Sequence, residues 1–233
     1  MRIITGIVVC LLILATNLLA QVDPTQILDK VQERYDAIED YRVKLNLKVD
    51  IPNFRMPNKN LRVFYKKPDK IKVETNGFAV VPRFGLVPTP AIFLNDSVRV
   101  TYLRSFKEGE TLFHVIAIYP QKPEKASPNV FLRINANRWT IDRVVIESPP
   151  EGSFELNVTY QNVDGFWLPD TTNIEFNLKH SIPMTERPNI NQPFGGMERY
   201  AGEDGQPVRG HMLITFSRFL VNRGISDRIF EEE

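Results

Sequence analysis

The hydrophobic positions of the chain follow two periods, first that of a helix and then that of strands. Asp23 suits a helix N-cap, and Pro24 suits the first helical position, where its missing N–H costs nothing. We predict a helix from there to about Asp40, with one apolar and one charged face. The apolar residues at helical spacing are Ile27, Leu28, Val31, Tyr35 and Ile38.

Beyond Asp40 the period becomes two, which predicts a long strand over residues 41–51 with one face toward water. Residues 112–119 are apolar on both faces apart from His114, so we expect this strand to be covered on both sides. The Lys67-Pro68-Asp69 sequence favours a turn between two strands. The other predicted strand segments are 61–65, 71–73, 131–134, 141–147, 154–160, 173–178 and 212–219, together with 93–103, which contains an Asn95-Asp96 turn before Val98, Val100 and Tyr102.

Two segments interrupt this alternation. Residues 76–90 are apolar but contain three prolines, and residues 180–210 are rich in Pro, Gly, Asn and charge. Proline cannot donate to a strand ladder, so we place neither segment in a central strand.

One helix cannot cover the sheet that this pattern predicts. About ten strands at ~4.8 Å spacing are about 48 Å wide, whereas a helix with its side chains covers about 10–12 Å. We therefore predict a mainly β fold in which a strongly curved antiparallel sheet forms an incomplete, half-open barrel around the helix. Its apolar concavity suits an apolar ligand; alternatively, its own side chains and residues 76–90 fill it.

The first 20 residues are typical of a secretory signal peptide. Arg2 is followed by an almost unbroken apolar run, which is too short for a membrane span. We predict cleavage near Ala20 and a soluble, exported chain whose residues 21–233 form a single domain. Cleavage would also remove Cys10, the single cysteine, and export without disulfides favours the bacterial periplasm.

Charge and composition exclude several functions. Without Arg2, the basic residues equal the 28 acidic ones, so the chain has no electrostatic footprint for nucleic acid or an anionic membrane. His114, His180 and His211 lie far apart without metal-ligand spacing, and no nucleophile or phosphate-loop motif occurs. Asp164 and Asp170 flank an aromatic turn; a paired-carboxylate site is the alternative there to ordinary turn chemistry. We predict that the chain has no enzymatic activity and binds no cofactor or metal. We also predict that it is a monomer.

Four motifs in order resemble the LolA-like family of periplasmic outer-membrane lipoprotein carriers, related in fold to LolB and RseB-type sensors. They are the helix ending in Tyr41, YKKPDKIKVE at residues 65–74, VDGFWLP at 163–169 and FLVNRGISDRIF at 219–230. The resemblance implies a helical lid over an apolar cavity that takes the acyl chains of a lipoprotein. It also implies an inner-membrane ABC transporter as donor and an outer-membrane acceptor. Lys67 stands where the family typically has a lid-locking arginine at the cavity mouth.

We expect the apolar inner-face residues to form the core and to line the lipid-binding cavity. This set comprises Leu45, Leu47, Val49, Val63, Tyr65, Val73, Ile116, Leu156 and Val158. The apolar segment between strands is either a buried plug or a mobile lid, formed by Phe78, Val80, Val81, Phe84 and Leu86. The alternatives to a carrier are a sensor that detects lipid or lipoprotein and regulates a membrane partner, and a structural envelope protein with a filled barrel.

Overall fold

The computed structural model describes residues 22–52, 57–76, 89–122, 128–148, 152–178 and 207–231. The predicted signal peptide lies outside these residues. The described elements are α2 (Pro24–Asp36), β1 (Asp40–Asp50), β2 (Lys59–Lys66), β3 (Lys70–Thr75), η1 (Pro90–Ile92), β4 (Val98–Glu108), β5 (Thr111–Pro120), β6 (Asn129–Asn135), β7 (Thr140–Ser148), β8 (Gly152–Val163), β9 (Phe166–Leu178), β10 (Val208–Val221) and α4 (Arg228–Glu231).

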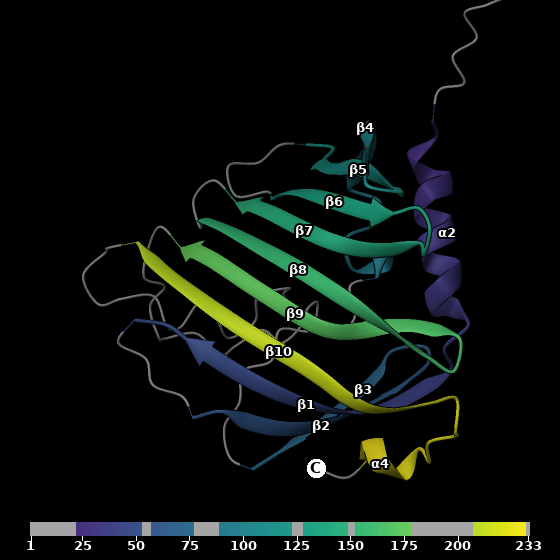
Figure 1. Cartoon of the computed structure of the whole chain (residues 1–233), viewed down its shortest axis with the longest axis vertical. Coiled ribbons are helices and arrows are strands. Elements are labelled where there is room, and N and C mark those ends of the chain that lie inside the picture. Colours follow the sequence, from purple (N-terminus) through teal and green to yellow (C-terminus); the bar gives the residue numbers. More distant parts are fainter. Residues whose placement is uncertain are drawn as a thin grey trace, which may run out of the picture.

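A single antiparallel sheet holds all ten described strands, in the order β3-β2-β1-β10-β9-β8-β7-β6-β5-β4. The first and last strands of this order, β3 and β4, do not pair with each other, so the sheet is open. It curves strongly, with α2 running across the strand ends along one margin (Figure 1). The predicted mainly β fold, with an incomplete barrel and one N-terminal helix, is confirmed.

The two ends of the sheet have different connections. At the end beside α2, adjacent strands are joined by short turns, such as Asp164-Gly165 between β8 and β9. Both residues of that turn have positive φ, 53° and 90°, as a two-residue hairpin requires. The opposite end carries longer connections, among them residues 76–97 and 179–207. We call these the turn end and the open end.

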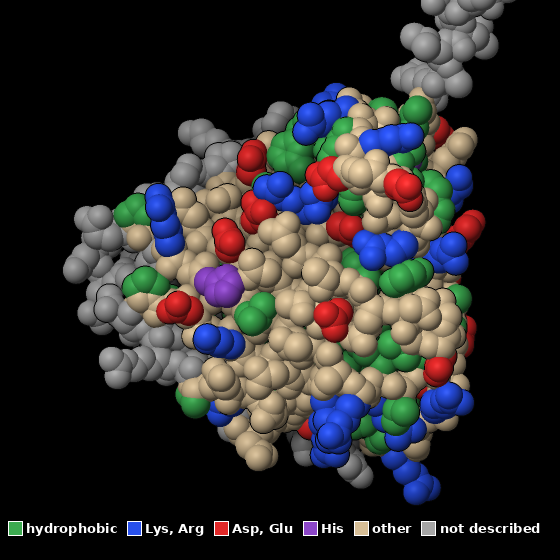
Figure 2. Space-filling view, viewed as in Figure 1, with side chains coloured by type: hydrophobic (Ala, Val, Ile, Leu, Met, Phe, Trp, Pro, Cys, Tyr) green, Lys and Arg blue, Asp and Glu red, His purple; other side chains and the backbone are tan. Residues whose placement is uncertain are grey.

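Strand register separates the two faces of the sheet. On the concave face one row of directly opposed side chains crosses eight strands, and all but its two outermost members are buried. The row consists of Val49, Met212, Ile174, Leu156, Val144, Leu132, Ile116 and Tyr102. The apolar face of α2 belongs to the same cluster of packed side chains. The convex face is mostly polar (Figure 2).

Several predicted boundaries are wrong; β4, for example, continues to Glu108 instead of ending at Leu103. The helix ends at Asp36 rather than near Asp40, although Asp23 caps it as predicted by accepting a 2.9 Å hydrogen bond from the Thr25 N–H. The turn before β9 is only Asp164-Gly165, so Pro169 lies within β9, opposite Tyr160 and next to a register shift. β10 begins at Val208 rather than Met212, so Gly210 lies within it, where the Phe176 ring on β9 occupies the space that a Cβ atom would need.

The concave row gives a test of the packing. Leu156 is fully buried at the centre of the sheet, and Leu156→Ala should lower the free energy of unfolding by about 2–5 kcal/mol because it leaves a cavity. Thr159→Ala, on the exposed face of the same strand, should change it by less than about 0.5 kcal/mol. Urea denaturation measures both, and equal effects of the two variants would contradict this assignment of the faces.

Candidate functional site

The candidate site is the concave face, which α2 borders at the turn end. The helix buries Ile27, Leu28, Val31 and Tyr35, while its charged residues point to water. Since one helix of 13 residues faces a row eight strands wide, α2 covers only part of this apolar surface.

An apolar cavity of about 270 Å³ lies at the open end of the concave face. Ile118, Val130 and Ile146 form its floor on β5, β6 and β7, and Ile92 and Phe93 border it from η1. Ile92 is 40% exposed, so the cavity has an apolar rim that reaches solvent. Ligand pockets for small molecules have volumes of about 300–1,000 Å³, so this cavity would accept only part of a long hydrocarbon chain without a rearrangement.

The register places all nine predicted cavity residues on the concave face. Leu45, Leu47, Val63, Ile116, Leu156 and Val158 are buried, Val49 and Tyr65 are half-buried, and Val73 is 38% exposed on the edge strand β3. None of the nine lines the open-end cavity. The residues of β5, β6 and β7 that do line this cavity could have been found from the same alternation of apolar and polar positions, continued to the open ends of these strands.

The predicted lid residues Phe78, Val80, Val81, Phe84 and Leu86 lie outside the described residues. Their segment joins β3 to Thr89, which directly precedes η1. One end of this segment is therefore attached beside the open-end cavity.

The C-terminal end of α2 is held by a polar clamp. Lys67, in the turn between β2 and β3, donates from Nζ to the Asp36 carbonyl at 2.5 Å and lies 3.4 Å from the Glu39 carboxylate. Asn222 donates from Nδ2 to the Ala37 carbonyl at 3.0 Å, and its Oδ1 accepts from the Glu39 N–H at 2.8 Å. Both side chains satisfy groups that a helix end leaves without intrahelical partners.

A pair of tyrosines, buried Tyr35 and half-buried Tyr160, fixes the same end of α2 to the sheet. The hydroxyl oxygens of Tyr35 and Tyr160 are 3.4 Å apart, and Tyr160 donates to the Ile141 carbonyl at 2.8 Å. Burial raises the pKa of Tyr35 to about 12, so the hydroxyl stays protonated at neutral pH. Together with the clamp, this pair makes the turn end the fixed end of the helix.

The middle of α2 meets an aromatic cluster that contains His114. The His114 ring stacks on Trp139 at 6.1 Å between centroids, and Lys30 Nζ lies 4.5 Å from the centre of the Trp139 ring. Burial, and then the charge of Lys30, lower the pKa of His114 below its usual 6.5. His114 is therefore neutral at neutral pH, which suits its place on the concave face.

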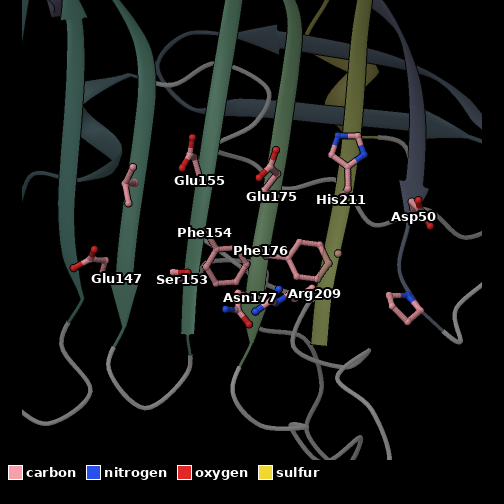
Figure 3. A pocket seen from close by; sticks show the side chains of 13 residues that line it. Asp50, Glu147, Ser153, Phe154, Glu155, Glu175, Phe176, Asn177, Arg209 and His211 are labelled. Carbon is pink, nitrogen blue, oxygen red and sulfur yellow. The ribbon is translucent and has the colours of Figure 1, made fainter. Parts of the chain in front are cut away.

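A hollow of about 730 Å³ lies on the opposite, convex face, and its lining mixes charged, amide and apolar side chains. Figure 3 shows Glu155, Glu175 and His211 side by side on neighbouring strands, with Asp50 beyond them. Burial alone would raise the pKa of Glu155, but hydrogen bonds from Asn157 and Arg143 hold it below its usual value. Its carboxylates make this hollow a poorer site for a hydrocarbon chain than the apolar cavity at the open end.

Of the residues considered for catalysis or metal binding, His180 lies outside the described residues. Asp164 forms a 3.2 Å ion pair with Arg223, and Asp170 is exposed on β9. Among the described residues, no group of three His, Cys, Asp or Glu side chains is arranged to hold a metal ion. The helices of the described ranges include none that is both long and apolar enough to span a bilayer.

Comparison with solved structures identifies the fold. A LolA superfamily protein from Nitrosomonas europaea matches with a TM-score of 0.53 and 13% identity, over 90% of this chain and 97% of the other. A putative outer membrane lipoprotein-sorting protein domain from Vibrio parahaemolyticus gives 0.53 and 11%, over 87% and 95%. A DUF1329 family protein from Desulfovibrio piger gives 0.55 and 11%, over 88% and 94%.

No protein-family model and no curated protein sequence matches the chain. The structural matches cover 87–90% of the chain, so the chain has a LolA-like fold. The fold resemblance predicted from the four motifs is confirmed.

The clamp gives a test of how α2 is held. Asn222 has a φ of 52°, and Asn222→Gly keeps this conformation while removing the side-chain hydrogen bonds. It should lower the free energy of unfolding by about 1–3 kcal/mol and speed hydrogen exchange in the last turn of α2. Asn222→Ala should cost about 1–2 kcal/mol more, because alanine is strained at this φ. If the Asn222→Gly variant is as stable as the wild type, the Asn222 hydrogen bonds contribute nothing to the free energy of unfolding.

His114 predicts a pH dependence of stability. Because its pKa is lower in the folded chain, the unfolded chain binds more protons below about pH 6.5, so stability should fall as the pH falls through that value. His114→Gln should lack this contribution. Urea denaturation of both proteins at about pH 7.5 and 5.5 measures the difference. A difference between the two proteins that is the same at both pH values would contradict the shift.

Proposed function

We propose that the chain is a periplasmic, non-enzymatic carrier that holds the acyl chains of a lipid or lipoprotein against its concave face. The observation that carries the proposal is the apolar cavity at the open end, on a concave face that is apolar across eight strands and bordered by one helix. The LolA-like fold supports it. One structure with this fold is described as an outer membrane lipoprotein-sorting protein domain.

The energetics of such a carrier follow from apolar burial. Each methylene group moved from water into an apolar site contributes about 0.8 kcal/mol, so affinity should rise about fourfold per added methylene. Acyl chains otherwise insert into a bilayer, so the site must offer a comparable apolar environment. The cavity of about 270 Å³ is small for a whole chain, so longer chains would require the cavity to widen. Release would then require a partner, such as a membrane acceptor, that binds the chain more favourably.

Binding of a fluorescent fatty acid to the delipidated protein tests this function. Saturable binding should strengthen with chain length until the site is full. Val98→Phe fills the cavity without introducing charge, and it should weaken binding by at least about tenfold.

Leu220→Phe is the matched control, because Leu220 is 50% exposed and opposite Arg42, outside the cavity. It should leave binding unchanged. Saturable binding that is equally strong in the Val98→Phe variant would place the ligand elsewhere, and no saturable binding to the wild type would contradict the carrier. The sensor alternative stays a prediction.

A further inference from the structure

The convex face divides into two chemically different halves. Over β8, β9, β10 and the open end of β1 it carries amides and carboxylates, including those of Figure 3. Over β4 to β7 it carries arginines and apolar side chains, and in the upper part of Figure 2 blue and green side chains gather with red ones among them. Arginine and aromatic side chains are the types enriched at protein–protein interfaces.

Three arginines belong to one cross-strand row of this second half. Register pairs Arg143 on β7 with Arg133 on β6, Arg133 with Val115 on β5, and Val115 with Arg104 on β4. At ~4.8 Å per strand, the three side chains start within about 14 Å of one another. Like charges on directly opposed positions are unfavourable, so Arg133 and Arg143 need anions near them.

The carboxylates of the described residues pair with only part of the guanidinium groups in this row. Arg143 is bound to Glu155 at 2.8 Å, and Arg133 lies 3.6 Å from Glu108, which is longer than a hydrogen bond. Arg104 is exposed and has no carboxylate partner among the described residues; its guanidinium lies 5.3 Å from the Phe106 ring centre. The guanidinium N–H groups that remain available to a carboxylate of a partner therefore belong mainly to Arg104 and Arg133.

A groove of about 300 Å³ runs beside these arginines. Its apolar lining comes from convex-face side chains of four strands, among them Phe106, Val115, Phe131 and Val145. The Arg133 guanidinium lies 4.9 Å from the Phe113 ring centre and covers that ring. We predicted that both faces of β5 are covered, and on its convex face arginine side chains supply this cover. The groove therefore combines apolar side chains with guanidinium groups.

We propose that this groove binds an acidic segment of a partner protein. An apolar side chain of the segment would enter the groove, and carboxylates on either side would pair with Arg104 and Arg133. Carboxylates two residues apart on an extended segment are about 6.6 Å apart, within the span of the arginine row. A depression on a convex face fits a peptide segment better than it fits a flat bilayer surface.

A peptide titration tests the proposal with the whole mature chain. The probe is a short fluorescent peptide in which glutamate and phenylalanine alternate, and its anisotropy should show saturable, salt-sensitive binding. Replacing both arginines, Arg104→Gln with Arg133→Gln, should weaken binding by at least about tenfold. Fatty-acid binding should not change, which separates this site from the proposed carrier function.

Lys48→Gln with Arg62→Gln is the matched control. Both residues are exposed on the convex side of β1 and β2, Lys48 lies in the same cross-strand row, and the pair removes the same net charge. This control should bind the peptide as the wild type does.

Four outcomes would overturn the proposal. They are no saturable peptide binding, equal loss in the control, equally strong binding of a peptide with lysine in place of glutamate, and wild-type binding by the Arg104→Gln, Arg133→Gln variant. Binding to phosphatidylglycerol vesicles that is lost in this variant, without peptide binding, would assign the groove to a membrane instead. Self-association in sedimentation that is lost in the same variant, without peptide binding, would assign it to a second copy of the chain.

Discussion

The width of the apolar face relative to one helix governs the rest of this structure. A row of opposed side chains from Val49 to Tyr102 crosses eight strands, and its interior members are excluded from water. A flat sheet of this width would leave most of that face exposed beside a helix about 10–12 Å across. Curvature brings opposite parts of the apolar face into contact with each other. It therefore reduces the apolar area that another element must cover. Because closure is incomplete, an apolar cavity remains at the open end.

Polar contacts determine which end of this half-barrel is fixed. Lys67 and Asn222 bind the last carbonyl groups of α2, and Tyr35 and Tyr160 meet inside the sheet near the same turn end. Hydrogen bonds of this kind require defined positions, whereas apolar contacts tolerate sliding and repacking. A change in cavity volume is therefore less costly at the open end, where apolar residues of η1 face the sheet. The Lys67 contacts also show that a lysine at this position can hold a helix through its end carbonyl.

The sequence predicted the elements whose cause is local and periodic. Alternation along residues 41–51 identified β1 and its buried face, and Asp23-Pro24 identified the start of α2. Features that depend on a distant strand were not predictable in this way. Gly210 is accommodated within β10 because Phe176, 34 positions away, packs over it, and Pro169 is tolerated at a register shift between β8 and β9. The arginine row likewise arises from register, since Arg104, Arg133 and Arg143 have no shared motif in the sequence.

The concave and convex sites are separated by only one layer of backbone. Leu132, in the apolar row, lies between Phe131 and Arg133 of the convex groove, and Val144 lies between Arg143 and Val145. Side chains alternate strictly along a strand, so neither set can shift without moving the other. A partner that draws the arginines of β4, β6 and β7 together would shorten the convex side and so reduce the curvature of the strands whose opposite face carries Ile118, Val130 and Ile146. Reduced curvature widens the concave side, so occupancy of the convex groove and of the apolar cavity would be coupled through the sheet itself.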